Sequence, residues 1–170
     1  VLSQIAKGSY RGKRIATNKP QYIRSLIESW PNESTIIWCR FNAEQEILAE
    51  TMPEAASIDG GTPDAERQRL VYAFKAGKIK TLITKPKILG FGMNLQIATR
   101  QIFSACDDSY EEFYQAVKRS NRVGSMRPLN VHIPVTTIER IQMENVLRKA
   151  RMVKSDAEEQ ERIFRNATAD

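Results

Sequence analysis

The sequence predicts an α/β fold in which helices cover both faces of a mostly parallel sheet. Segments rich in β-branched and apolar residues alternate along the chain with amphipathic segments at helical spacing. The predicted strands are continuous apolar runs, not alternating ones, which indicates that both of their faces are buried. The 170 residues suit one domain of a size that can bury a sizeable core. We therefore expect a three-layer sandwich of helices, sheet and helices.

Strand and helix signals divide the chain in order. The predicted strands are 34–41, 56–58, 79–84, 99–106 and 129–135. The predicted helices are 19–30, 43–51, 63–76, 109–122 and 136–153, followed by a last helix from Ser155. Asn42 and Thr62 are the expected N-caps of two helices, and Gly77 is expected to end one. The domain boundaries that follow are an irregular lead-in over 1–18, the domain proper over 19–136 and a helical extension over 137–170.

The charge distribution points to a polyanionic partner. The net charge is +6, and lysine and arginine gather in residues 1–30 and 118–154, on either side of a mildly acidic middle. Two such blocks favour contact with a nucleic-acid backbone, although an ordinary solvated surface is the alternative. No apolar run approaches the ~20 residues that span a bilayer, and the N-terminus lacks a signal-peptide pattern. We therefore expect a cytoplasmic protein with no membrane partner.

Residues that often carry chemistry elsewhere are expected to be structural in this chain. Cys39 and Cys106 each lie in an apolar run without a second ligand nearby, which predicts reduced core thiols and not a disulfide or a metal site. His132, the single histidine, lies in an alternating run and is expected to be a strand residue. Five aromatic residues have core spacing and are expected inside: Trp30, Trp38, Tyr72, Phe74 and Phe103.

The stretch QAVKRSNRVGS holds two arginines, Arg119 and Arg122, one helical turn apart and just ahead of a glycine. Gln115 recurs on a neighbouring turn of the same face. A guanidinium is always charged, and its planar fork matches phosphate oxygens. A pair on one helix could hold a phosphoryl group whose charge grows during transfer, whereas the helix dipole alone would explain one cation near a helix end. The chain has no G-x-x-x-x-G-K-[ST] loop, so another body would have to bring the nucleotide.

A second candidate site follows the predicted strands at their carboxyl ends, where open α/β sheets bind ligands. Lys85 and Lys87 follow one strand and could bind a nucleic-acid phosphate, and Arg40 ends another strand on the same edge. Gly90 and Gly92 allow the backbone to approach a ligand closely. The alternatives are a simple turn with solvated lysines and, for Arg40, a surface ion pair.

Several blocks of the sequence, in one order, resemble those of superfamily-two helicases, especially the Swi/Snf-type DNA translocases. QAVKRSNRVGS resembles motif VI, KILGFGMNLQ resembles motif V and STIIWCRF resembles motif IV. IDGGTPDAERQRLVYAFKAG is similar to the family's block with the pattern D-G-x-T, then R and F, and TTIERIQMENVLRKA looks like the helix that follows the domain. The blocks have the family's order and spacing and cover about residues 20–150.

The resemblance implies a RecA-like fold and the role of second lobe in a two-lobed motor. Arg119 and Arg122 match the family's arginine fingers, which act on ATP and Mg²⁺ held mainly by a first lobe that these residues do not include. Gln115 matches a residue that helps to sense the phosphates. In motif V, Asn94 matches a residue facing the nucleotide, and Gly92 is assigned to the nucleotide with it. Arg40, Lys85, Lys87 and Gly90 are the expected nucleic-acid contacts.

The sequence departs from the family pattern near motif VI. Asn121 stands where the family usually has histidine, Lys118 replaces a small or acidic residue, and the residues 108–110 replace Trp-Asn-Pro. The stretches GFGMNLQ and SYEEFYQAVKR together look closer to phage and mobile-element relatives than to eukaryotic remodellers. The expected function is the second lobe of an ATP-dependent helicase or translocase, inactive alone, whose expected nucleic-acid partner is DNA before RNA. The alternative is a non-catalytic module, derived from such a lobe, that docks on nucleic acid or protein.

Overall fold

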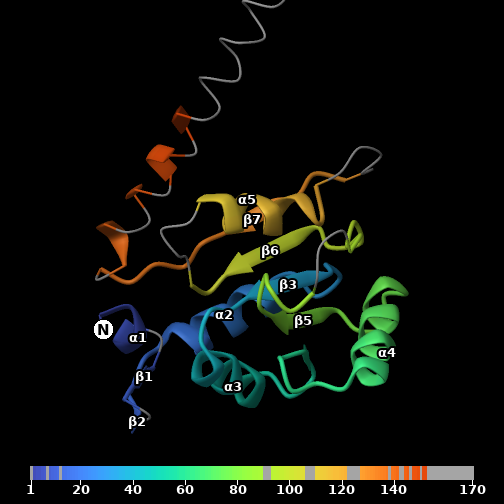
Figure 1. Cartoon of the computed structure of the whole chain (residues 1–170), viewed down its shortest axis with the longest axis horizontal. Coiled ribbons are helices and arrows are strands. Elements are labelled where there is room, and N and C mark those ends of the chain that lie inside the picture. Colours follow the sequence, from blue (N-terminus) through green and yellow to red (C-terminus); the bar gives the residue numbers. More distant parts are fainter. Residues whose placement is uncertain are drawn as a thin grey trace, which may run out of the picture.

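The computed structural model places a parallel sheet between two layers of helices (Figure 1). It describes residues 2–6, 8–11, 13–89, 93–105, 110–121, 127–137, 139–141, 144–145, 147–149 and 151–152. In chain order the elements are α1 (Leu2–Ala6), β1 (Ser9–Tyr10), β2 (Lys13–Arg14), α2 (Lys19–Glu28), β3 (Thr35–Trp38), α3 (Asn42–Thr51), β4 (Ala56–Ser57), α4 (Asp64–Lys75), β5 (Thr81–Thr84), β6 (Arg100–Phe103), α5 (Tyr110–Lys118) and β7 (Asn130–His132).

The main sheet has five strands in the order β4-β5-β3-β6-β7, and every neighbouring pair is parallel. Trp38 at the end of β3 pairs with Thr84 of β5 and Phe103 of β6, so these three strands end in register. The chain therefore leaves the strands along one edge, which we call the carboxyl edge. The predicted α/β sandwich with a mostly parallel sheet is confirmed.

Two apolar clusters, one on each face of the sheet, hold the layers together. Helices α2 and α3 cover one face through residues such as Ile23 and Leu48. Helices α4 and α5 cover the other face, where Phe74 and Ala116 pack in the same cluster as Trp38. Successive strand residues point to opposite faces, so β3, all of whose residues are buried, contributes to both clusters. Fully burying a large apolar side chain stabilises the fold by about 1.5–3 kcal/mol, which makes the sheet a firm support for polar residues at its edge.

The irregular lead-in predicted over residues 1–18 is wrong in its local structure. This stretch forms the short helix α1 and an antiparallel hairpin of β1 and β2. Arg14 binds both carboxylate oxygens of Glu50 on α3, at 2.6 and 2.5 Å. Gly8 has φ of +84°, and a Cβ atom there would lie 3.2 Å from a methyl group of Ile47. Packing against α3, and not a periodic sequence, thus shapes the N-terminal segment.

The expected helix caps are only partly correct. Asn42 and Thr62 are not N-caps, because α3 begins at Asn42 itself and α4 begins two residues after Thr62. The hydroxyl of Thr62 instead donates to the Asp59 carboxylate and accepts from the Asp59 N–H, both at 3.0 Å. Gly77 follows α4 in the left-handed region with φ of +70°, which confirms the predicted helix end.

The core contains most of the aromatic residues expected there. Trp38, Phe74 and Phe103 are buried, and Trp30 is half-buried. Tyr72 is 70% exposed, so its prediction as a core residue is wrong. It lies on α4 next to Val71, which takes the buried position of that turn.

The remaining structural expectations concern single residues and the C-terminal extension. Cys39 is a buried free thiol whose pKa is raised well above its usual value by burial, and His132 is a strand residue as predicted. Cys106 and the last helix predicted from Ser155 lie outside the described residues. Residues 140–141, 144–145, 147–149 and 151–152 are helical, in agreement with the predicted helix. Within the described ranges, no helix has the length and apolar character needed to cross a bilayer.

Candidate functional site

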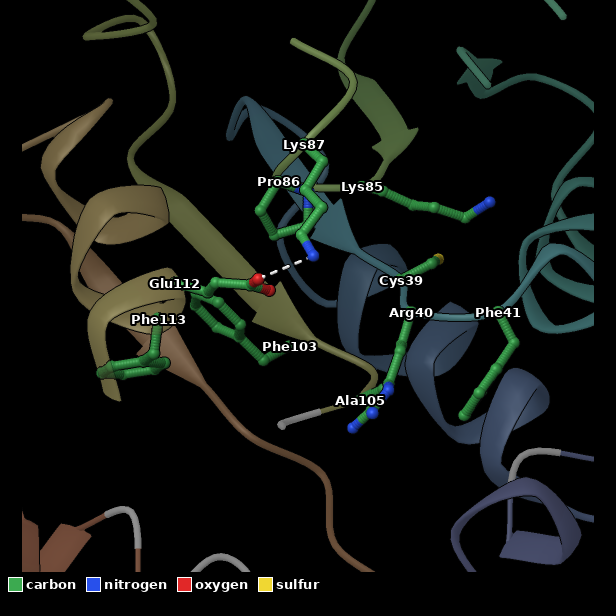
Figure 2. Close-up of a pocket in the computed structure, with 10 residues that line it drawn as sticks. All are labelled: Cys39, Arg40, Phe41, Lys85, Pro86, Lys87, Phe103, Ala105, Glu112 and Phe113. Atoms are coloured by element: carbon green, nitrogen blue, oxygen red, sulfur yellow. Dashed lines mark ion pairs between the residues drawn. The ribbon is translucent and has the colours of Figure 1, made fainter. Parts of the chain in front are cut away.

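A hollow at the carboxyl edge brings together three of the four predicted nucleic-acid contacts. It measures about 270 Å³ and is lined by Arg40 after β3, by Lys85 and Lys87 after β5, and by Phe103 and Ala105 at the end of β6. Figure 2 shows Lys87 turned toward Glu112 of α5, and Lys85 turned away from it. The parallel sheet thus collects cations that lie about 45 residues apart in the sequence onto one edge.

The lysines of this hollow have partners within the chain. Lys87 Nζ lies 3.0 Å from a carboxylate oxygen of Glu112, in an ion pair that is open to solvent. Lys85 Nζ donates to the side-chain oxygen of Asn42 at the start of α3. Both side chains are flexible and their contacts are at the surface, where such pairs contribute about 0–1 kcal/mol. An incoming phosphate could therefore compete for either lysine at small cost.

Arg40 is held at its backbone. Its side chain is exposed, and the guanidinium carbon lies 5.4 Å from the centre of the Phe41 ring. The backbone N–H of Arg40 donates to Glu44 Oε2 at 3.0 Å, and the N–H of Phe41 donates to the same oxygen at 3.2 Å. The other oxygen of Glu44 accepts from the hydroxyl of Ser104 at 2.6 Å. Reasoning from the sequence missed Glu44, although its place three residues into the helix could have marked it as a capping residue.

A second hollow, of about 430 Å³, adjoins Lys85 on the side of β4. Asp59, Gly60 and Gly61 line it, and they belong to the D-G-x-T block. The Thr62 hydroxyl, followed by the N–H groups of Gly61 and Thr62, holds the pKa of Asp59 below its usual value. This loop therefore presents an ionised carboxylate beside the lysine.

Arg119 lies beyond the end of its helix and is buried. The predicted helix over 109–122 is wrong at its C-terminal end, because α5 ends at Lys118. Only 7% of Arg119 is exposed. Its Nη2 donates to the carbonyl of Pro86 at 3.4 Å. The arginine thus reaches from the end of α5 toward the loop that follows β5.

The C-terminal end of α5 is hydrogen-bonded to the neighbouring strand and to the segment before it. Gln101 of β6 is buried and donates from Nε2 to the carbonyl of Ala116 at 3.1 Å and to the hydroxyl of Ser120 at 2.8 Å. The N–H of Leu95 donates to the carbonyl of Arg119 at 3.0 Å. These bonds connect the last turn of α5 and the residues after it with β6 and with the segment of motif V. Gln101 is a second residue that sequence reasoning missed; its signal was an amide inside an apolar strand.

The structure describes two of the other predicted nucleotide contacts, Asn94 and Gln115. Asn94 is exposed and directly precedes Leu95, so it lies beside the Arg119 backbone; its side chain bonds to Gln96 at 3.0 Å. Gln115 is exposed on α5, one turn before Arg119. The predicted sites at Arg122, Gly90 and Gly92 lie outside the described residues. In the part of the chain that the structure describes, no group of His, Cys, Asp or Glu could hold a metal ion.

Comparison of the sequence with known proteins finds a matching family and several relatives. The model of the helicase conserved C-terminal domain matches residues 18–124. The ATP-dependent helicase fft1 of Schizosaccharomyces pombe is 34% identical over 132 residues, which cover 74% of this chain and 14% of fft1. The chain thus spans about a seventh of the length of this curated relative.

Two solved structures have a similar fold. The C-terminal part of the Fun30 ATPase domain superposes with a TM-score of 0.65 at 24% identity, covering 75% of this chain and 45% of that one. The C-terminal domain of the DEAD-box protein Dbp5 superposes with a TM-score of 0.65 at 16% identity, covering 78% of both chains. At these identities the likeness concerns the fold, and the sandwich of this chain is the RecA-like one that was expected.

Proposed function

Since this chain belongs to the family of helicase conserved C-terminal domains, as a C-terminal RecA-like lobe of Swi/Snf type in superfamily two, we propose that it is the second motor lobe of an ATP-dependent DNA helicase or translocase. In this proposal the first lobe binds ATP and Mg²⁺, and the present lobe closes on it. Closing and opening of the two lobes is a hinge motion that alternates the grip on the nucleic acid.

The observation that carries the proposal is the hydrogen bond from the N–H of Leu95 to the carbonyl of Arg119, at 3.0 Å. It joins the segment of motif V to the segment of motif VI, which are far apart in the sequence. We assign Arg119 and Arg122 as arginine fingers, and Gln115, Asn94 and Gly92 as nucleotide contacts. When bound, ATP supplies the phosphoryl group whose developing negative charge the guanidinium groups would stabilise.

The carboxyl edge is the proposed nucleic-acid surface. Arg40, Lys85 and Lys87 border one hollow there, and we assign them, with Gly90, to the phosphate backbone, with DNA favoured over RNA. Phosphate contacts position a protein on nucleic acid without reading its sequence, as a translocating motor requires. We also propose a cytoplasmic setting, with which the free buried thiol of Cys39 agrees.

The burial of Arg119 favours one alternative. A non-catalytic docking module would keep the fold and the basic edge, and an arginine that is only 7% exposed could serve packing alone. Turnover measurements on Arg119 variants separate the two functions, whereas nucleic-acid binding alone does not.

The test of the proposed surface is the salt dependence of oligonucleotide binding by the 170-residue chain. Each phosphate contact contributes about 0.7–0.9 to the slope of log K against log salt. Replacing Arg40, Lys85 and Lys87 together by alanine should lower the slope by about 2 to 3. The matched control replaces Lys75, Lys78 and Lys80, which are exposed and lie between α4 and the opposite end of β5, and should leave most of the slope in place. Equal losses of slope in both triple variants would show that binding depends on overall positive charge and not on these three residues, which would contradict the assignment.

A further inference from the structure

Glu44 is a buried carboxylate at the carboxyl edge for which the proposed function has no use. The residue is 3% exposed and lies in the first turn of α3. Its Oε2 accepts from the backbone N–H groups of Arg40 and Phe41, and its Oε1 accepts from the hydroxyl of Ser104. One side chain thus connects the residues that follow β3 with the first residue after β6.

Helix capping explains only part of this arrangement. A glutamate at the third helical position commonly reaches back to the N–H of the N-cap, here Phe41, and a carboxylate is favoured near a helix N-terminus. Capping does not require the N–H of Arg40. It also does not require Ser104, which is 60 residues away and directly follows β6. A buried carboxylate is costly unless it is fully hydrogen-bonded, so these additional bonds are what make the site tolerable.

The bonds of Glu44 fix the two walls of the hollow that the proposed function assigns to nucleic acid. Arg40 forms one wall, and Ala105, the residue after Ser104, forms part of the other. We propose that Glu44 is a positioning residue, which holds Arg40 and the end of β6 in the arrangement that accepts a phosphodiester group. This inference rests on the proposed function, because it concerns the same hollow.

The charge of Glu44 makes the inference testable, because charge and position predict opposite effects. A negative charge near a phosphate opposes binding, so an influence through charge alone would make every neutral variant bind more tightly. An influence through position makes binding weaker when the acceptor oxygens are removed. Glu44→Gln separates the two, since its amide oxygen can accept from the N–H groups while its NH₂ donates to Ser104.

The experiment measures oligonucleotide binding by the 170-residue chain over a range of salt concentrations. Glu44→Ala should lower the slope of log K against log salt by about 0.7–0.9, the contribution of one phosphate, and Arg40→Ala should do the same. The double variant should lose no more than either single one. Glu44→Gln should keep the wild-type slope and bind at least as tightly. Glu46→Ala, which removes an exposed charge from the same helix, should keep the slope as well.

Melting curves accompany each variant, and binding is measured well below every midpoint. If Glu44→Ala does not fold, Ser104→Ala, which removes only the bond to β6, should lower the slope in the same direction. If the Glu44→Ala chain folds and keeps the wild-type slope, the proposal is overturned. If the Glu44→Ala chain does not fold, a wild-type slope in Ser104→Ala overturns the proposal instead. The surface assignment itself fails if the triple variant of Arg40, Lys85 and Lys87 keeps its slope or loses no more of it than the control triple variant, so the two failures are distinguishable.

Discussion

At the scale of single residues, Arg119 combines a structural role inside the lobe with the proposed role of an arginine finger, and these two roles conflict. Its backbone carbonyl accepts from Leu95, and its guanidinium donates to Pro86 from a buried position. A surface arginine near a helix end would contribute about 1 kcal/mol or less to stability. Removing a buried arginine also removes the packing of its long stem, so we expect a cost on the order of 2 kcal/mol. Loss of activity in a variant must therefore be separated from loss of fold.

In the complete two-lobed protein, Arg119→Ala should lower the kcat for ATP hydrolysis by about 10³- to 10⁵-fold, as expected for an arginine finger. Arg119→Lys should restore little, because a point charge does not reproduce the planar fork. Lys118→Ala is the control, since it removes the adjacent exposed cation. The measurement is kcat at saturating DNA, together with a melting curve. If turnover falls only in proportion to stability, Arg119 is structural and the docking module becomes the better account.

A pH dependence of stability in the histidine range can be assigned to His132, because it is the single histidine. Arg100 Nη1 donates to His132 Nε2 at 3.1 Å, and the imidazole ring lies 4.3 Å from the ring of Trp30. Burial, and then the charge of Arg100, hold the pKa of His132 below its usual value. The unfolded chain therefore binds a proton at a higher pH than the folded chain, and stability must fall as the pH falls through the ordinary histidine range.

The expected outcome is a free energy of unfolding that decreases between about pH 7.5 and about pH 5.5 in the wild type and decreases less in His132→Gln. Glutamine remains uncharged over this range and can accept the bond from Arg100. Urea titrations at each pH measure the difference. Parallel pH profiles for the two proteins would mean that the protonation of His132 is not linked to folding.

At the scale of elements, the sequence predicted what local patterns determine and missed what distant contacts determine. The strands were found because apolar runs such as 79–84 mark a buried parallel sheet whatever their neighbours are. The hairpin of β1 and β2 was missed because its strands have only two residues each, too few to show an alternating pattern. The end of α5 was misplaced because no local pattern marks it, whereas in the fold Gln101 of β6 bonds to the Ala116 carbonyl there. Arg40, Lys85 and Lys87 were placed correctly on one edge, since parallel topology alone brings strand ends together.

A buried ion pair attaches the C-terminal extension to the sandwich. Lys19 at the start of α2 donates to both carboxylate oxygens of Glu139, at 2.8 and 3.1 Å, and the two side chains are 6% and 7% exposed. Glu139 also accepts from the N–H and the hydroxyl of Thr136. A positive charge at a helix N-terminus is unfavourable, so Glu139 compensates for Lys19 at that place.

Glu139→Gln should destabilise the chain by about 3–5 kcal/mol, because it leaves a buried ammonium group without its counter-charge. The double variant Lys19→Met/Glu139→Gln should be more stable than Glu139→Gln alone, since the orphaned charge is gone. Glu144→Gln breaks the exposed pair with Arg140 and should cost less than about 0.5 kcal/mol. Denaturant titrations give the three values. A double variant as unstable as the single one would show that the charge pair does not attach the extension.

At the scale of the whole molecule, the candidate nucleotide residues and the candidate nucleic-acid residues lie on segments that contact one another beside the same sheet. Residues 85–89 follow β5 and bring Lys85 and Lys87 to the carboxyl edge, and Pro86 among them accepts a hydrogen bond from the guanidinium of Arg119. The N–H of Leu95 donates to the carbonyl of Arg119 from a second segment. A displacement of residues 85–89 by nucleic acid would therefore reach the buried arginine through Pro86. The lobe has the means to link the two surfaces, but it has no phosphate-cradling loop of its own.

We therefore expect that the 170-residue chain alone hydrolyses no ATP, with or without DNA, whereas the complete two-lobed protein does. Positioning of the β- and γ-phosphates and of Mg²⁺ requires a P-loop and an acidic metal ligand, which the proposal assigns to the first lobe. Phosphate release is measured with the purified chain at saturating oligonucleotide, and nucleotide affinity is measured by calorimetry, where we expect very weak binding. The Arg119→Ala chain serves as the control for contaminating ATPases, because a contaminant would be insensitive to it. A steady DNA-stimulated rate that disappears in Arg119→Ala would locate a complete nucleotide site within this lobe and refute the two-lobed assignment.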